Sequence, residues 1–182
     1  MRTLIKPPHA RIIMAAAALV GMFASAYLLD VYVRNAPIVC GLNGSGGCEA
    51  VRASEWAYVF GAIPRPALGL AFFLPFFVLL CIRAATPKHA DRLRQLTKTL
   101  AAIGALESVY LVGLQAFAIK AYCLWCLTVS AASFVIAGMA IYDHKEDPRS
   151  MSAFRELRWY LLMFIAYAPL AAFLFLVLTR LK

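Results

Sequence analysis

The chain has 182 residues, of which 63% are hydrophobic and only 15% are charged. About a quarter of the residues in a soluble domain are charged, and the apolar residues here form long uninterrupted blocks. The composition therefore excludes an ordinary soluble protein and indicates a membrane protein. The net charge is +9, but the basic residues lie mainly between the apolar blocks. This pattern argues against a nucleic-acid partner and favours contacts with membrane lipid headgroups.

Five segments are apolar and long enough to cross a bilayer, which takes about 20 residues. All five are predicted to be helices, because lipid satisfies no backbone hydrogen bonds and nothing in the chain alternates like a barrel strand. The prediction is a single all-α membrane domain over residues 1–182. Its spans lie at about 12–33, 66–82, 99–119, 123–142 and 160–178.

A loop over residues 34–65 separates the first two spans, and it is rich in glycine and aromatic residues. Glycine lets the loop bend, and its aromatic side chains need cover, so it is expected to fold over the mouth of the bundle. Within it, Ala53 to Phe60 is predicted to form a short helix that begins near Ser54.

The loops also predict the orientation. The amino terminus and the two loops on its side hold 12 of the Lys and Arg residues, against 6 on the other side. The positive-inside rule then places the amino terminus in the cytoplasm and residues 34–65 on the periplasmic face of the inner (plasma) membrane. Residues 143–147 are expected to form a solvated inner loop. A cleavable signal peptide ending near Ala26 is the alternative for the start, but the apolar run continues to Val33, which suits a retained helix better.

The five cysteines divide into two pairs and one isolated residue. Cys40 and Cys48 lie in the outer loop, whereas Cys123 and Cys126 open the fourth span on the same side. A helix amino terminus lowers the pKa of a thiol, and a second nearby cysteine resolves a mixed disulfide. The pattern predicts a relay between a thiol partner and an acceptor in the membrane. Cys81 lies at the opposite end and is expected to be an inert buried residue.

Two other interpretations of the cysteines remain open. Four cysteines can bind zinc, although the spacing lacks a second short pair and no histidine lies in these segments. A metal-binding or transport membrane protein is therefore the alternative function. The loop pair can also be a purely structural disulfide, as in a membrane subunit without catalytic activity.

A known family shares these features. They are Cys40, Cys48, Ser54, Trp56, Cys123 and Cys126, together with the segment Ser108-Val109-Tyr110-Leu111. In this spacing they resemble the vitamin K epoxide reductase family over about residues 12–142. The resemblance implies that family's four-helix bundle, here with a fifth transmembrane helix. DsbB-like quinone reductases do a related job, but they carry the helix-proximal pair before the loop pair.

The resemblance implies a role for each cysteine. Cys40 and Cys48 would exchange with a separate periplasmic thioredoxin-like (DsbA-like) protein. Cys48 would then exchange with Cys123, and Cys126 would be the thiolate nearest a quinone. Ser54 would support the active site from the loop, or would simply cap the short loop helix.

The resemblance also implies which side chains contact the quinone head. Trp56, Tyr122 and Cys126 are expected there, with Arg65 and Ser130 at the places where vertebrate members carry Asn and Tyr. These two departures favour ubiquinone or menaquinone over vitamin K epoxide as the acceptor, and no bound metal is expected.

Two polar residues of the third span and some aromatic residues stay open. Glu107 either supplies protons or bonds to another helix, or, as the simpler interpretation, is a buried and neutral hydrogen-bonded carboxyl. Gln115, two turns further on, is its expected polar partner. Phe117, Tyr122 and Trp125 either line a quinone slot or belong to an interfacial aromatic belt.

Overall fold

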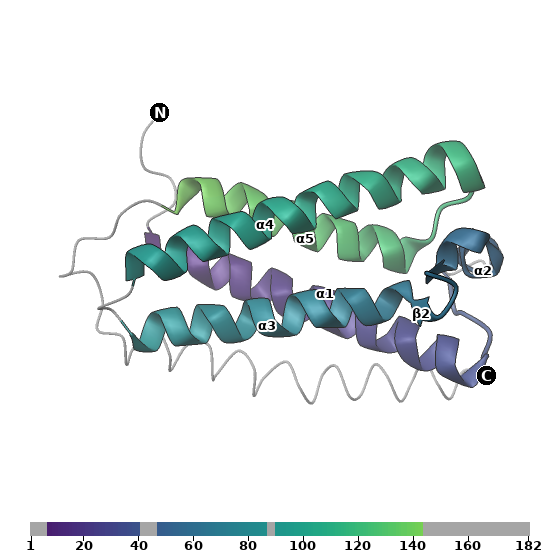
Figure 1. Cartoon of the computed structure of the whole chain (residues 1–182), viewed down its shortest axis with the longest axis horizontal. Coiled ribbons are helices and arrows are strands. Elements are labelled where there is room, and N and C mark those ends of the chain that lie inside the picture. Colours follow the sequence, from purple (N-terminus) through teal and green to yellow (C-terminus); the bar gives the residue numbers. More distant parts are fainter. Residues whose placement is uncertain (1–6, 41–46, 87–89, 144–182) are drawn as a thin grey trace.

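The computed structural model describes residues 7–40, 47–86 and 90–143, and four long helices dominate it (Figure 1). They are α1 (Pro7–Arg34), α3 (Arg65–Ala85), α4 (Ala90–Gly113) and α5 (Leu124–Tyr142). Each contains a stretch long and apolar enough to cross a membrane, and this confirms the predicted all-α membrane bundle. The predicted fifth span, 160–178, lies outside the described residues.

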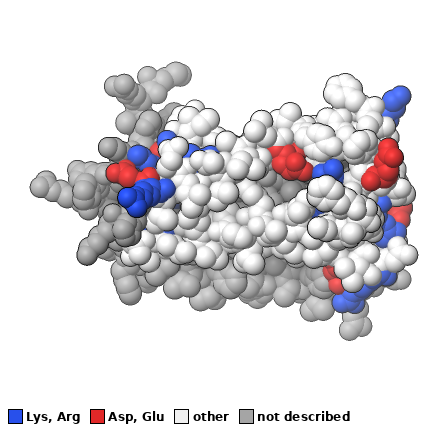
Figure 2. All heavy atoms as spheres, viewed as in Figure 1, with Lys and Arg blue, Asp and Glu red and all other residues white. Residues whose placement is uncertain are grey.

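Two of the helices begin earlier than predicted. α1 starts at Pro7 rather than near residue 12, and α4 starts at Ala90 rather than near residue 99. The first turns of α4 are charged and include an ion pair between Asp91 and Arg94 at 3.1 Å. A helix can continue past the apolar block into the headgroup region, where its charged side chains are solvated. Figure 2 shows the charged residues of one face mainly towards the two ends of the molecule, with a wide uncharged area between them.

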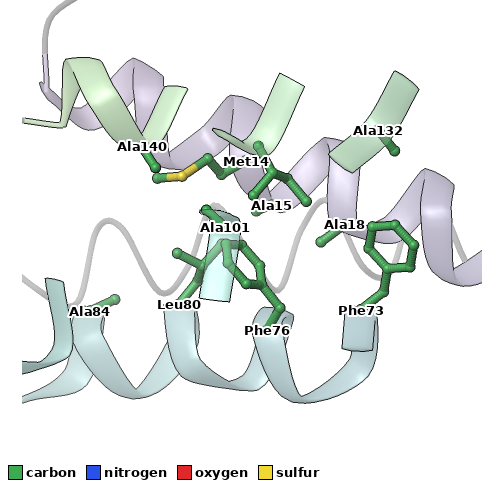
Figure 3. Packing of buried hydrophobic residues seen from close by; sticks show 11 residues of the cluster. Met14, Ala15, Ala18, Phe73, Phe76, Leu80, Ala84, Ala101, Ala132 and Ala140 are labelled. Atoms are coloured by element: carbon green, nitrogen blue, oxygen red, sulfur yellow. The ribbon is translucent and has the colours of Figure 1, made fainter. Parts of the chain in front are cut away.

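The core forms where α1 packs against α3 and α5. α1 and α5 contribute mostly small residues to it, and α3 contributes large ones; Figure 3 shows Phe73, Phe76 and Leu80 of α3 pointing towards α1. At Gly21 of α1 the approach is so close that a Cβ atom would lie 2.4 Å from the Phe73 ring. Small residues at helix interfaces are the usual means of bringing membrane helices together.

A buried ion pair closes the end of the bundle away from the loop, which we call the arginine end. Arg83 of α3 donates two hydrogen bonds to the carboxylate of Asp143, one of them at 3.2 Å, and both side chains are almost completely buried. The prediction that the residues from 143 onwards form a solvated loop is therefore wrong for Asp143. Its carboxylate is drawn inside because a buried guanidinium needs a paired anion.

The loop between α1 and α3 folds at the other end, which we call the cysteine end. It contains α2 (Gly47–Ala53), a short 3-10 helix (Glu55–Ala57) and an antiparallel hairpin of β1 (Tyr58–Val59) and β2 (Ile63–Pro64). The prediction of a helix from Ala53 to Phe60 is therefore wrong, except for the single 3-10 turn within that range. The chain reverses after Val59, where Phe60 and Gly61 both adopt positive φ angles.

Candidate redox site

Three of the four outer cysteines meet in one buried cluster at the cysteine end. Cys40 and Cys48 form a disulfide, with their Cα atoms 6.0 Å apart. Together with Val51 and Cys123 they make a small buried core, and Cys126 packs against its edge. Cys81 lies apart from them, at the margin of the main core. The fold therefore brings together the two pairs that the sequence placed on one side.

Two hydrogen bonds fix the backbone of Val39, the residue before Cys40. The Val39 N–H donates to the hydroxyl of Tyr27 at 3.3 Å, and its carbonyl accepts from Trp125 Nε1 at 2.9 Å. The rings of Tyr27 and Trp125 also pack together, with centroids 4.6 Å apart. Trp125 lies inside the Cys-x-x-Cys segment, so the same side chain links the helix pair to the loop pair.

α2 approaches the segment just before α5 closely enough to need a glycine. A Cβ atom on Gly47 would lie 2.3 Å from the carbonyl oxygen of Tyr122, a clash that no other residue avoids without movement. This contact places Cys48, the next residue, beside Cys123. On the far side of α2, Arg52 donates to the carbonyl of Ala36 at 2.6 Å and pairs with Glu49. The loop disulfide is thus held from both sides.

Gln115 positions Cys123. The α4 helix ends in a π-helical segment, Leu114–Ile119, and Lys120 then takes a left-handed conformation with φ 54°. The buried amide oxygen of Gln115 accepts a hydrogen bond from the Cys123 N–H at 2.8 Å. The expectation that Gln115 pairs with Glu107 is wrong, because the wide π turn points the amide towards the start of α5 instead. The feature of the sequence that could have indicated this role is a glutamine placed just before the break between two spans.

The environment of Cys123 favours its thiolate. The Cys126 thiol donates to the Cys123 sulfur, and the backbone N–H groups of Cys126 and Trp125 add to this. Together they lower the pKa of Cys123 below its usual value, although burial acts in the opposite direction. Cys123 occupies the N-cap position at the start of α5, which is where the sequence placed a thiol of lowered pKa.

A cavity of about 330 Å³ lies beside the cysteines, and its wall is largely apolar. Cys126 is on this wall, and so are Trp56 and Arg65. Tyr122 and Ser130, the other two residues expected at a quinone head, are not among the lining residues. Tyr122 is instead mostly exposed, and Ser130 is buried within the bundle.

An ion pair carries the charged groups of the wall. Arg65, the first residue of α3, donates from Nη1 to Glu107 at 3.0 Å and from Nε to the Trp56 carbonyl at 2.5 Å. Its guanidinium also lies 5.4 Å from the centre of the Tyr110 ring. Glu107 is about half exposed, so the expectation that it is buried is wrong, whereas its bond to Arg65 of α3 is the interhelix contact that the sequence left open. The carboxylate faces an arginine that the linear sequence places 42 residues earlier.

Two of the residues singled out from the sequence lie off the cavity. The Ser54 hydroxyl donates to the Val51 carbonyl at 2.7 Å and does not cap the following helical turn through its side chain. It therefore fixes the end of α2, the helix that carries Cys48. Phe117 is strongly exposed on the outside of the bundle, as an interfacial aromatic residue would be.

No group of three or more His, Cys, Asp or Glu side chains within the described residues is arranged to hold a metal ion. Two of the four cysteines that the zinc interpretation requires are joined to each other. In this form they offer no thiolate to a metal, because each sulfur is engaged in the disulfide.

Comparison with models of protein families gives a match. The model of the vitamin K epoxide reductase family matches residues 12–141, which is well over half of the chain. This range includes both cysteine pairs, the whole of α3 and α4, and all of α1 and α5 except the first five residues of α1 and the last residue of α5. It confirms the resemblance drawn from the cysteine spacing. A search of curated proteins finds no match.

Proposed function

We propose, from the premise that this chain belongs to the vitamin K epoxide reductase family, that it oxidises a thioredoxin-like protein and reduces a quinone. Members of this family are membrane oxidoreductases that use quinones. The observation that carries the proposal is the arrangement of four cysteines in sequence: Cys48 packs with Cys123 in one buried cluster, and Cys126 lies on the wall of an apolar cavity. A relay needs this order.

The loop pair makes the first exchange. A thiolate of the partner protein attacks the Cys40–Cys48 disulfide and forms a mixed disulfide with one loop cysteine. The second thiol of the partner then attacks that mixed disulfide and leaves oxidised. Two electrons have now moved to the chain, and Cys40 and Cys48 are both thiols. We propose a separate periplasmic protein of the DsbA-like class as this partner.

The second exchange runs from the loop pair to the helix pair. Cys48 attacks the sulfur of Cys123 in a Cys123–Cys126 disulfide, and Cys126 leaves as a thiolate. Cys40 then attacks Cys48, which restores the loop disulfide and releases Cys123. Once Cys126 has taken up a proton, its thiol and two backbone N–H groups lower the pKa of Cys123, which supports this direction, since a thiol of low pKa leaves readily.

The helix pair then passes its electrons to the acceptor. Cys123 and Cys126 lose two electrons and two protons and form a disulfide, while a quinone gains both and leaves as the quinol. The residues present fit such a molecule, because an apolar cavity suits the ring and Cys126, Trp56 and Arg65 line it. Arg65 would offer positive charge to a carbonyl oxygen, and the surrounding apolar side chains would exclude water. We propose ubiquinone or menaquinone as the acceptor.

The topology is part of the same proposal. Disulfides persist in oxidising compartments, and the distribution of basic residues predicts a cytoplasmic amino terminus. We therefore propose that the cysteine end faces the periplasm and the arginine end faces the cytoplasm of a plasma (inner) membrane. Lipid around α3 and α4 would admit the quinone and accept the quinol.

The decisive experiment replaces Cys126 by Ala and follows quinone reduction with a dithiol donor. Quinone turnover is expected to fall by about two orders of magnitude or more, as it does when a nucleophile is removed. Cys81→Ala is the matched control, since Cys81 lies in the main core away from the cavity, and it should keep its turnover. Unchanged turnover in Cys126→Ala, or a stoichiometric zinc ion that blocks thiol labelling, would contradict the proposal.

A further inference from the structure

The cavity wall holds a buried hydroxyl that no described residue engages. Ser25 of α1 lines the cavity and is 1% exposed, and its Oγ has no hydrogen-bond partner within the described residues. A serine in a helix commonly bonds back to the carbonyl one turn earlier, but Ser25 does not. A buried hydroxyl in this state costs the free protein stability, so it calls for an explanation.

α3 leaves room for this hydroxyl through a glycine. A Cβ atom on Gly69 would lie 2.3 Å from the Ser25 Oγ and 3.1 Å from its Cβ. Gly69 also lines the cavity, next to Phe72 and Phe73 of the same helix. The two helices therefore meet around the hydroxyl and leave it at the edge of an apolar space. Such an arrangement suits a ligand that is mostly apolar and carries a hydrogen-bond acceptor.

Ser130 provides the natural comparison. It is also 1% exposed, and its hydroxyl also has no partner among the residues that the structure describes. It lies one turn after Cys126, where the family resemblance suggested a quinone contact. However, its neighbours Val129 and Ser133 line the cavity and Ser130 does not. The unpartnered hydroxyl on α1 therefore borders the cavity, whereas the one on α5 does not.

We propose that the hydroxyl of Ser25 donates a hydrogen bond to a ring carbonyl oxygen of the quinone in this cavity. The proposal rests on the quinone-reducing function proposed above and adds a binding residue to it. A carbonyl oxygen supplies the missing acceptor, and the ring occupies the apolar space that Phe72 and Phe73 border. Ser25 then distinguishes a quinone from an apolar lipid tail, because a tail offers no acceptor.

The test combines an infrared spectrum with kinetics. Purified protein is loaded with ubiquinone or menaquinone labelled with ¹³C at one ring carbonyl, for each of the two carbonyls in turn. A hydrogen bond from Ser25 lowers the stretching frequency of one labelled carbonyl, and Ser25→Ala should return that band towards its position in apolar solvent. The KM for quinone should rise about three- to ten-fold in Ser25→Ala, the usual effect of one neutral hydrogen bond.

Ser130→Ala is measured in parallel, because the two serines make opposite predictions. We expect its labelled bands and its KM to match those of the unmodified protein. A carbonyl band that moves in Ser130→Ala, or that stays in place in Ser25→Ala, would overturn the assignment of Ser25. Thermal denaturation without quinone should show Ser25→Ala to be at least as stable as the unmodified protein, because an unpartnered buried hydroxyl has been removed.

The experiment separates this inference from the function on which it rests. If the unmodified protein does not reduce quinone from a dithiol donor, the proposed function fails. If it does, and the spectrum and KM of Ser25→Ala are unchanged, only the role of Ser25 fails.

Discussion

The two ends of the bundle treat their polar groups in opposite ways. At the arginine end, Arg83 and Asp143 pair through two hydrogen bonds inside the protein, and only the Nε of Arg83 is left without a partner among the described residues. At the cysteine end, the disulfide packs against a free thiol, Glu107 is half exposed, and a buried hydroxyl on the cavity wall has no partner among the described residues. The contacts at the arginine end hold helices together. At the cysteine end, Cys126 and the unpartnered hydroxyl of Ser25 lie on the wall of a cavity, where a ligand can reach them.

The largest expected effect comes from opening the closed end. Arg83→Ala leaves the carboxylate of Asp143 buried without its cation, which should lower the free energy of unfolding by about 3–5 kcal/mol. Thermal denaturation in detergent measures this. Quinone turnover at a temperature where the variant is folded should stay near normal, because the cavity wall does not include Arg83.

Arg94→Ala is the matched control for that experiment. Arg94 pairs with the exposed Asp91 in the first turns of α4. An exposed ion pair contributes about 0–1 kcal/mol to the free energy of unfolding. Equal loss of stability in the two arginine variants would show that the buried ion pair stabilises the protein no more than the exposed pair does.

A smaller effect is expected from a substitution of Gln115, whose hydrogen bond positions Cys123 at the cysteine end. Gln115→Leu removes the acceptor of the Cys123 N–H, and a buried donor left without a partner costs about 1–3 kcal/mol. Because Cys123 then loses its fixed position, transfer from the loop pair to the helix pair should slow. Stopped-flow reduction of quinone by protein with a pre-reduced loop measures that step.

Gln95→Leu makes the same change on an exposed face of α4 and should alter neither quantity. If Gln115→Leu left the transfer rate unchanged while lowering stability, Gln115 would be a purely structural residue.

The smallest expected effect is a shift in pH dependence. The thiolate is the reactive form, so alkylation of Cys123 should slow as the pH falls through its lowered pKa. Cys126→Ala removes the thiol that donates to Cys123, and burial then acts with less opposition. The pKa of Cys123 should therefore rise, and the loss of reactivity should begin at a higher pH. Alkylation rates resolved by residue with mass spectrometry, in protein whose loop disulfide is intact, test this. Identical pH midpoints in both proteins would rule out the Cys126 thiol as the cause.

Much of the bundle follows from the sequence, because hydrophobic length is a local property. Apolar blocks of about 20 residues have to be helical in lipid, and the four described spans are helices. The helix ends were predicted less well, since the first turns of α4 carry too many charged residues to be part of an apolar block, although Leu93 and Leu96 lie among them. The spacing of the cysteines was equally informative, as it placed both pairs at one end.

The contacts that make the site depended on tertiary structure. Arg65 and Glu107 are 42 residues apart in the sequence. Ser25 and Ser130 are both buried, and neither hydroxyl has a hydrogen-bond partner among the described residues. Nothing local in the sequence indicates that Ser25 faces the cavity and Ser130 does not. That difference depends on which side of each helix faces the cavity, and Gly69 lets α3 approach Ser25. The sequence by itself determined that four thiols and a membrane bundle belong together. Packing decided which polar groups were satisfied within the described fold and which were left for a ligand, because hydrogen-bond partners are chosen by proximity in space.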